Sequence, residues 1–323
     1  MSVERTLSVR PVPKRIKHRR DSKLKDNAQL YLMSLPAMLQ LFLFAYLPLA
    51  GLIIAFKEFD FDAGIFGSPW MKPIYGNFRI LLDHNPDAMS AIRNTLLLNT
   101  LFISVGTVFA LALALMFNEI THKFYQRLTQ SVTFLPYFIS TVVLGVFVAG
   151  LFTYDSGTIN HILTLLGFNK IPFYERPEFW PAILLAVNIW RGAGYSAIVY
   201  LAAITNIDTT FYEAAEIDGA TRWQRTWFIS LPMIMPTVII LTLLAVGRIM
   251  NADFGFFFNI TTDQPMIYPT TDVLDTYIYR ALRRTGDIGI SSATGFFQSV
   301  ISFILVLVCN KLAGKYEKEA ALF

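Results

Sequence analysis

The sequence has 323 residues, of which 54% are apolar and only 15% are charged, with a formal net charge of +4. Soluble domains usually carry about a quarter charged residues, so this composition excludes an ordinary soluble enzyme and excludes disorder for the bulk of the chain. The single cysteine excludes a disulfide framework and a cysteine-rich metal site. We therefore predict a helical membrane protein.

Six stretches of the sequence are long and apolar enough to cross a membrane. Each has roughly 20 or more residues and at most one charge, and a helix of that length spans an apolar core about 30 Å thick. None shows the strict alternation of a barrel strand. We predict an all-α integral membrane protein whose transmembrane domain covers residues 27–312. Its six spans are expected at about 28–56, 94–117, 129–153, 180–205, 231–250 and 289–310.

Basic residues predict how these spans are oriented. Residues 1–26 form a tail rich in Lys and Arg, which by the positive-inside rule stays in the cytoplasm. Six spans then return the tail 313–323 to the cytoplasm. A basic tail can also bind nucleic acid, but beside a membrane span it is better explained as a topology anchor on anionic lipid. We therefore expect the lipid bilayer as a partner and no nucleic acid.

No motif for catalysis or nucleotide binding occurs in the sequence. It lacks the GxxxxGK[ST] loop that cradles phosphates, the HExxH zinc motif and the GxSxG nucleophile elbow. The four histidines are scattered, so we predict no metal site and no cofactor in this chain. The chain is not expected to be an enzyme, and a membrane-embedded enzyme is the weakest alternative.

The loop of residues 208–231, between the fourth and fifth spans, carries the most informative local signals. Asp208 or the residue after it can cap a short helix, and Gly219 suits the left-handed position that ends that helix. Thr221 with Gln224 three residues later predicts a capping box that opens a second helix. The residues alone predict a helix–turn–helix finger, which is either a plug for another protein or an ordinary interfacial helix.

This loop resembles the EAA loop of bacterial ABC importer permeases, whose pattern is EAA…G…I-LP. The elements of that pattern and of the fuller EAAxxDGA form of sugar permeases are matched by Glu213, Ala214, Ala215, Asp218, Gly219, Ala220, Ile229, Leu231 and Pro232. The resemblance implies a type I permease bundle with a cytoplasmic coupling helix that docks on an ATPase subunit. It also implies that ATP and Mg lie on that partner. The implied coupling residues are Glu213, Ala214, Ala215, Glu216, Asp218, Gly219 and Ala220.

The resemblance extends over nearly the whole chain beyond the basic tail. The stretches YLMSLPAMLQLFLFAYLPLAGLIIAFKEFD, DVLDTYIYR and ATGFFQSVISFILVLVCNKLAGK are similar to permeases that import oligosaccharides of the polygalacturonan type. Among these, the chain most resembles a membrane subunit of an alginate-oligosaccharide importer. Such an importer contains a second, different permease, an ATPase dimer and an extracytoplasmic solute-binding protein in the bacterial cytoplasmic membrane.

Two arginines fall inside predicted spans, where a charge is costly and suggests a functional role. Arg191 lies in the fourth span and Arg248 in the fifth, and Asn251 follows Arg248 at i+3 on the same helical face. Arginine binds a carboxylate with two parallel hydrogen bonds, and the resembling permeases tend to carry a neutral residue at Arg248, so an acidic oligosaccharide is favoured. The substrate path is predicted to include Arg248, Asn251, Arg191, Asp253, Trp190 and Tyr195.

Several alternatives stay open at this point. The arginines can be structural, either extending to the membrane surface or paired locally, as Arg248 with Asp253. The aromatic residues can belong to a lipid-facing belt rather than to a sugar path. The solute can be a neutral oligosaccharide or another class such as peptides. A channel or membrane scaffold without ATP coupling is a further alternative.

Overall fold

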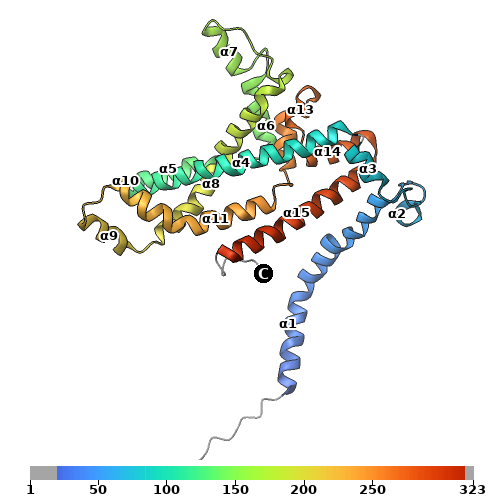
Figure 1. The fold of residues 1–323 in the computed structure, drawn as a ribbon, viewed down its shortest axis with the longest axis horizontal. Coiled ribbons are helices and arrows are strands. Elements are labelled where there is room, and N and C mark those ends of the chain that lie inside the picture. The colour runs from blue at the N-terminus through green and yellow to red at the C-terminus, as the bar shows by residue number, and fades with distance from the viewer. Residues whose placement is uncertain (1–19, 84, 317–323) are drawn as a thin grey trace, which may run out of the picture. The chain divides into compact units, whose positions relative to one another are not determined.

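The computed structural model describes residues 20–83 and 85–316, and side-chain positions for 30–83 and 85–315. Most of the predicted basic tail and of the predicted C-terminal tail therefore lies outside the described residues. The described part is almost entirely helical and contains no strand, only one isolated bridge between Lys57 and Trp70. Figure 1 shows these helices and their labels.

The chain divides into two units, residues 1–52 and 53–323. The first unit contains α1 (Arg20–Leu41), η1 (Phe42–Tyr46) and the start of η2 (Leu47–Phe56). Leu30–Phe56 is an uninterrupted apolar stretch, long enough to cross a membrane.

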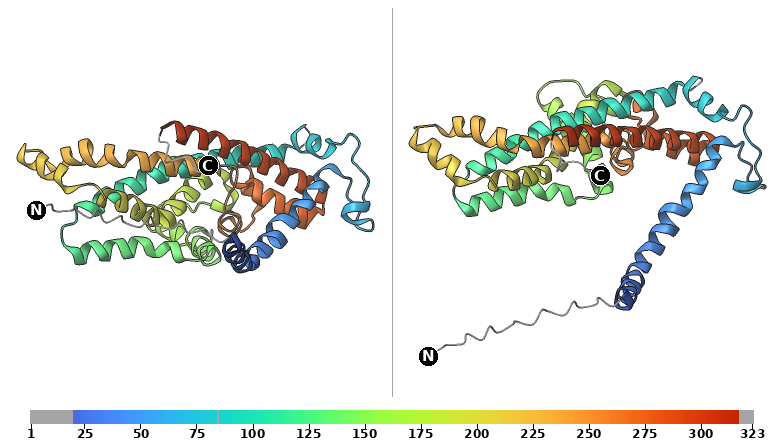
Figure 2. Two further views of the ribbon diagram at one scale, coloured as in Figure 1. Left: turned by 90° about the horizontal axis from the view of Figure 1, so that it is seen from below. Right: turned by 60° about the horizontal axis from the view of Figure 1, so that its bottom comes forward.

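The second unit is built on four long helices, α4 (Pro86–Glu119), α8 (Trp180–Thr205), α11 (Leu231–Gly247) and α15 (Ile288–Tyr316). Figures 1 and 2 show α4, α11 and α15 extending along a common direction. Small residues allow α4 and α8 to approach closely, because Ala110 and Ala114 of α4 pack with Ala197 of α8 in one buried cluster. Asn85 caps α4, where its side chain accepts a hydrogen bond from the Ala88 amide at 3.1 Å.

The third predicted span, 129–153, is not a single straight helix. α5 (Lys123–Phe134) and η3 (Leu135–Phe138) lead to α6 (Thr141–Phe152) through a bend of 97°. Pro136 interrupts the helical hydrogen bonds, and Ser140 caps the new helix by accepting from the Val143 amide at 3.3 Å. Five described helices are long and apolar enough to cross a membrane, and the bent pair makes a sixth if its two halves together form one span. The predicted all-α fold is confirmed, with five or six candidate spans in the described part of the chain.

Short helices connect the long ones. Between α11 and α15 lie α12 (Phe254–Thr261), η7 (Pro265–Ile267), α13 (Tyr268–Thr271), α14 (Leu274–Arg280) and η8 (Ala281–Thr285). Others are α2 (Gly64–Gly67), α3 (Gly76–Asp83), α7 (Thr158–Leu165), η4 (Phe173–Glu175) and η5 (Pro177–Phe179). The largest buried apolar cluster joins α6, α8 and α12, with Leu144, Trp180 and Phe256 almost fully buried in it.

An ionic network with two buried carboxylates holds the connection between α11 and α15. Arg280 pairs with Asp272, Arg284 pairs with Asp263, and the Arg280 guanidinium lies 3.9 Å from the centre of the Tyr268 ring. The Tyr268 hydroxyl donates to an Asp263 carboxylate oxygen at 2.7 Å. Burial, with this hydrogen bond to Asp263, raises the pKa of Tyr268 to about 12. The network therefore holds the segment of residues 263–284 in place.

Candidate functional site

The finger predicted over 208–231 is present at one end of the second unit, where Figure 1 shows α9 and α10. α9 (Thr209–Ile217) starts after Asp208, whose carboxylate accepts from the Thr210 amide at 3.0 Å. This hydrogen bond lowers the pKa of Asp208. Gly219 ends the turn with a φ of +79°, and α10 (Arg222–Arg225) opens with the Thr221–Gln224 capping box. The local signals in the sequence are confirmed.

Most side chains of α9 are exposed among the described residues. Glu213, Ala214, Glu216 and Asp218 are exposed, whereas Ala215 is half-buried. Two apolar side chains that the sequence argument did not single out are also exposed, Phe211 by 51% and Ile217 by 87%. Together they add exposed apolar area to a helix that is otherwise mostly polar or small, and this area is available to a binding partner.

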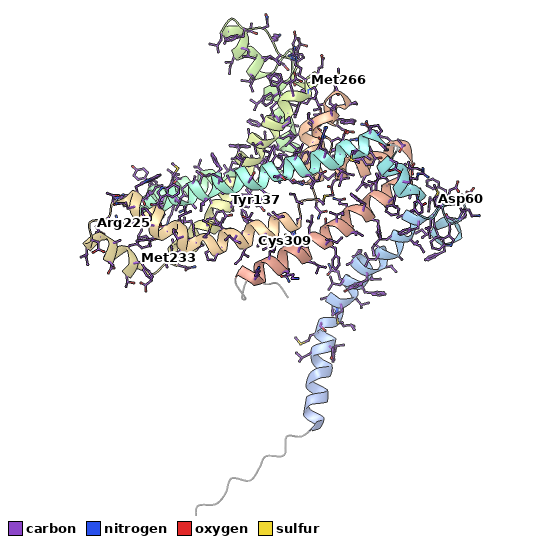
Figure 3. The ribbon with its side chains drawn as sticks, viewed as in Figure 1. Asp60, Tyr137, Arg225, Met233, Met266 and Cys309 are labelled. Atoms are coloured by element: carbon purple, nitrogen blue, oxygen red, sulfur yellow. The ribbon has the colours of Figure 1, made fainter. Side chains whose placement is uncertain are left out.

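Two contacts attach the finger to the long helices, and a third joins its own two helices. The Tyr212 hydroxyl lies 2.9 Å from the Ser230 hydroxyl at the start of α11, and Arg225 forms an ion pair with Glu216 at 3.1 Å. Arg222 forms an ion pair with Glu119 at the end of α4, at 3.5 Å. The finger is thus fixed to α11 on one side and to α4 on the other. Figure 3 places Arg225 at this end and Asp60 at the opposite end of the second unit.

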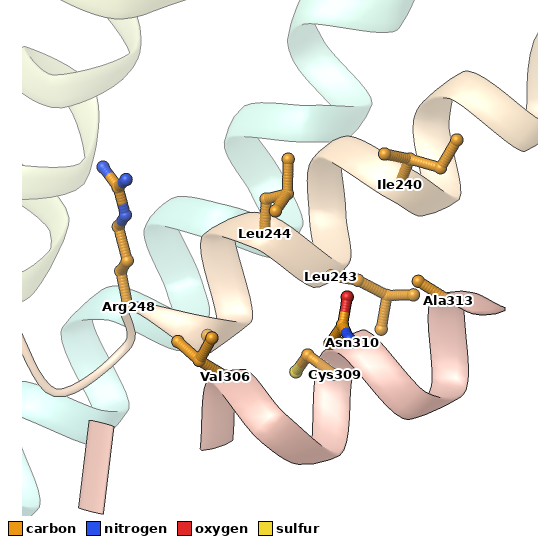
Figure 4. Close-up of a pocket in the computed structure, with 9 residues that line it drawn as sticks. Ile240, Leu243, Leu244, Arg248, Val306, Cys309, Asn310 and Ala313 are labelled. Atoms are coloured by element: carbon orange, nitrogen blue, oxygen red, sulfur yellow. The ribbon is translucent and has the colours of Figure 1, made fainter. Parts of the chain in front are cut away.

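The fifth span ends earlier than the sequence predicts, which corrects two expectations. α11 stops at Gly247, and Arg248 already has non-helical backbone angles (φ −107°, ψ 14°). Arg248 therefore does not lie within the helix, and Asn251 does not follow it on the same helical face. Figure 4 shows Arg248 at the rim of a small cavity of about 110 Å³ between α11 and α15, its side chain extending away from the apolar lining residues.

Side-chain amides from two other helices explain this early end. The Asn99 amide of α4 donates to the carbonyl of Ile249 at 2.7 Å, and the Gln298 amide of α15 donates to the carbonyl of Met250 at 2.9 Å and to Asn251 Oδ1 at 3.0 Å. Backbone groups that leave a helix inside a membrane protein need such partners. Because these partners come from distant segments, the sequence around residue 248 does not reveal the break.

Arg191 is paired, and its partner is Asp253 rather than a residue of its own helix. Arg191 Nη1 lies 3.1 Å from Asp253 Oδ2. Asp253 Oδ1 accepts from the Phe256 amide at 3.0 Å and so caps α12. The local alternative, an ion pair between Arg248 and Asp253, is therefore wrong. Two of the predicted path residues, Arg191 and Asp253, are brought together from segments 62 residues apart.

The two predicted aromatic residues flank Arg191 and are about half exposed, Trp190 by 46% and Tyr195 by 45%. Each stacks on a residue that the sequence argument missed. Trp190 stacks on Phe147 with 5.8 Å between ring centres, and Tyr195 stacks on Tyr137 with 4.6 Å between ring centres. The bend before α6 brings these partners into place, so no local signal identifies them.

The face of α8 beside these aromatics opens into a cavity of about 400 Å³ between α4, α8 and α11. Its lining combines apolar residues with polar ones, among them Thr107, Asn188, Tyr195, Ser196 and Tyr200. Amide and hydroxyl groups among aromatic rings provide the hydrogen bonds and stacking surface that a sugar ring uses.

One half-buried carboxylate stabilises the non-helical segment. Asp275 Oδ2 accepts from the Ala252 amide at 2.8 Å and from the Gln298 amide at 3.1 Å. Burial raises the pKa of the Asp275 carboxyl, and these two hydrogen bonds oppose the rise only in part. Within the described ranges, no group of three or more His, Cys, Asp or Glu side chains could hold a metal ion.

The bundle of long apolar helices and its exposed finger define the class of protein, a permease of an ABC importer. Residues 106–316 match the family described as binding-protein-dependent transport system inner membrane component. The chain belongs to this family. Its place is therefore the bacterial inner membrane, and the alternative of a scaffold or channel outside this transport class is wrong.

Similar proteins agree with this assignment over most of the chain. The polygalacturonan/rhamnogalacturonan transport system permease protein YteP of Bacillus subtilis (strain 168) is 34% identical over 92% of this chain and 91% of its own. A solved bacterial ABC transporter involved in the import of the acidic polysaccharide alginate is 34% identical, with a TM-score of 0.83, over 93% of this chain and 100% of its own. A second structure, of a bacterial alginate ABC transporter in complex with an alginate pentasaccharide-bound periplasmic protein, is 34% identical with a TM-score of 0.82. The match covers 93% of this chain and 99% of the other.

Proposed function

We propose that this permease imports acidic oligosaccharides that contain uronate units. One observation carries the proposal: two arginines meet at the non-helical segment that follows α11. Arg248 lies in this segment, and Arg191 contacts it through Asp253. A charge at this depth in a helical bundle is costly and is retained mainly where a ligand or ion needs it. The similarity to the alginate importer and to the polygalacturonan permease supports the same substrate class.

The side chains of the site match the chemistry of a uronate. An arginine can bind a carboxylate with two parallel hydrogen bonds, which a neutral sugar cannot offer. Trp190 and Tyr195 provide ring faces on which sugar rings can stack, and Asn251 provides an exposed amide. A neutral oligosaccharide would use the stacking surfaces but offers no carboxylate for an arginine to bind.

The chain works in this proposal as one subunit of a larger assembly. A second, different permease completes the path, and an ATPase dimer on the cytoplasmic side binds ATP and Mg. An extracytoplasmic binding protein delivers the oligosaccharide, and the similar alginate transporter, solved in complex with a pentasaccharide-bound periplasmic protein, supports this arrangement. This chain itself catalyses no reaction and needs no cofactor.

The finger is the proposed contact with the ATPase. Its docking surface comprises the exposed side of α9 and the turn that follows it, with Glu213, Ala214, Ala215, Glu216, Asp218, Gly219 and Ala220. The alanines allow close approach, and Phe211 and Ile217 add exposed apolar area. ATP-driven closure then moves α9, and the Tyr212–Ser230 contact passes this movement to α11.

The substrate class is tested by replacing Arg248 and measuring uptake of a radiolabelled uronate oligosaccharide into proteoliposomes that contain the whole importer. Arg248→Ala is expected to reduce this uptake by at least about ten-fold, because one charge-assisted hydrogen bond alone contributes about 1.5–3 kcal/mol and ten-fold corresponds to about 1.4 kcal/mol. Arg248→Lys keeps the charge without the planar fork, and an intermediate loss is expected.

Arg283→Ala is the matched control, because Arg283 is another exposed arginine in the connection between α11 and α15. Its uptake should equal that of the wild type. Unchanged uronate uptake by Arg248→Ala, or an equal loss in Arg283→Ala, would show that Arg248 does not bind the substrate.

A further inference from the structure

The two side chains of the ion pair between Arg191 and Asp253 differ in their exposure to solvent. The Arg191 side chain is only 23% exposed, whereas the Asp253 side chain is 53% exposed. Arg191 Nε is buried and has no hydrogen-bond partner. The cation is therefore held in place and still has an unused donor, while the carboxylate lies on the open side of the pair.

The two oxygens of the Asp253 carboxylate have separate partners. Oδ1 accepts from the Phe256 amide at 3.0 Å and caps α12, and Oδ2 binds Arg191 Nη1 at 3.1 Å. The cap fixes the position of the residue even when the second oxygen loses its partner. The bond to Arg191 can therefore be given up without unfolding the start of α12.

We propose that Asp253 occupies the place of the substrate's carboxylate in the empty permease, and that an arriving uronate takes this place on Arg191. The inference rests on the proposed function and adds a specificity-determining residue to it. The exchange replaces one carboxylate by another, so that the Arg191 charge has an anionic partner before and after.

This exchange favours acidic over neutral ligands for a simple electrostatic reason. A neutral sugar that separates Asp253 from Arg191 leaves a mostly buried cation without an anion, which is costly in a site of low polarity. A uronate restores the ion pair as it binds. Asp253 thus opposes ligands that lack a carboxylate, and it competes weakly with those that have one.

The test is equilibrium binding of a radiolabelled uronate oligosaccharide to the complete importer in lipid nanodiscs, without the binding protein. Asp253→Asn removes the charge and keeps a side-chain oxygen for the cap. With the competing carboxylate gone, the uronate is expected to bind about five-fold more tightly, a modest gain because the pair is partly exposed. Asp253→Ser also keeps a capping oxygen and should give the same tightening.

The tightening must depend on Arg191. In an Arg191→Gln background, where uronate binding is weakened, adding Asp253→Asn should change the affinity no further. The matched control is Asp287→Asn, because Asp287 is a second capping carboxylate, which fixes the start of α15 by accepting from the Ile290 amide at 2.8 Å. Binding by this control should equal that of the wild type.

Two results would overturn the inference. Equal or weaker uronate binding by both Asp253→Asn and Asp253→Ser, in an importer whose wild type binds uronate, would show that the ion pair is only structural. Tightening that persists in the Arg191→Gln background would show that it does not act through this arginine. A wild-type importer that binds no uronate would contradict the proposed function as well, which separates the two failures.

Discussion

Arg191 illustrates how a single residue can be predicted to matter while its partner stays hidden. Its position in an apolar span makes a partner or ligand necessary, because an isolated charge there is costly. The partner Asp253 lies 62 residues away and arrives beside Arg191 only because α11 ends early. The residue type and its place in an apolar span predicted that Arg191 has a role. Which carboxylate contacts it depends on the tertiary structure.

Ile217 carries the residue-scale prediction for the finger. It is 87% exposed at the end of α9, on the proposed ATPase contact. Burying an isoleucine at an interface is worth about 1.5–3 kcal/mol, and a charge at that point must also be desolvated. Ile217→Asp is therefore expected to reduce transport-linked ATP hydrolysis by at least about ten-fold in the reconstituted importer.

Leu165→Asp is the matched control for this variant. Leu165 is similarly apolar and 73% exposed, but it lies at the end of α7, away from the finger. The control should hydrolyse ATP at the wild-type rate with substrate-loaded binding protein. Full activity of Ile217→Asp would mean that α9 does not dock through this side chain.

At the scale of the elements, the bend between α5 and α6 shapes the site more than any other feature. It places α6 against α12, and Gly145 makes the contact possible. A Cβ atom on Gly145 would lie 2.4 Å from the backbone oxygen of Asn259 in α12, a distance that no rotamer change can relieve. The close packing of α6 and α12 therefore requires glycine at this position.

Gly145→Ala is expected to destabilise the protein by about 1–3 kcal/mol, because the two helices must separate to admit the methyl group. The measurement is the thermal unfolding midpoint of the purified importer, which should fall by several degrees. Gly150→Ala on the same helix is the control, since a Cβ there meets nothing within 4 Å and alanine favours the helix. An equal midpoint for both variants would contradict the packing of α6 on α12.

The elements differ in how well the sequence predicts them. The caps of the finger were predictable, since Asp208, Gly219 and the Thr221–Gln224 pair act through hydrogen bonds or backbone angles within a few residues. The end of α11 was not, since amides from α4 and α15 take the carbonyls of residues 249 and 250. Hydropathy detects the apolar length of residues 129–153 but not the bend within it.

At the scale of the whole molecule, the finger and the arginine site lie at the two ends of one helix. α11 starts beside the Tyr212–Ser230 contact and ends at Gly247, next to Arg248. Its 17 residues span about 25 Å, a large part of the membrane thickness. A displacement of the finger by the ATPase would therefore reach the non-helical segment through a rigid connection, which is the geometry that alternating access requires.

The central claim is that this permease admits acidic oligosaccharides, and one comparison tests it directly. Proteoliposomes that contain the complete importer and are loaded with ATP would be given one of two substrates of equal length. One is a uronate oligosaccharide, and the other is the same oligosaccharide with its carboxyl groups reduced to alcohols. The uptake of each is measured. We expect ATP-dependent accumulation of the uronate form and at least about ten-fold slower uptake of the neutral form. Equal uptake of both forms, or faster uptake of the neutral one, would contradict it.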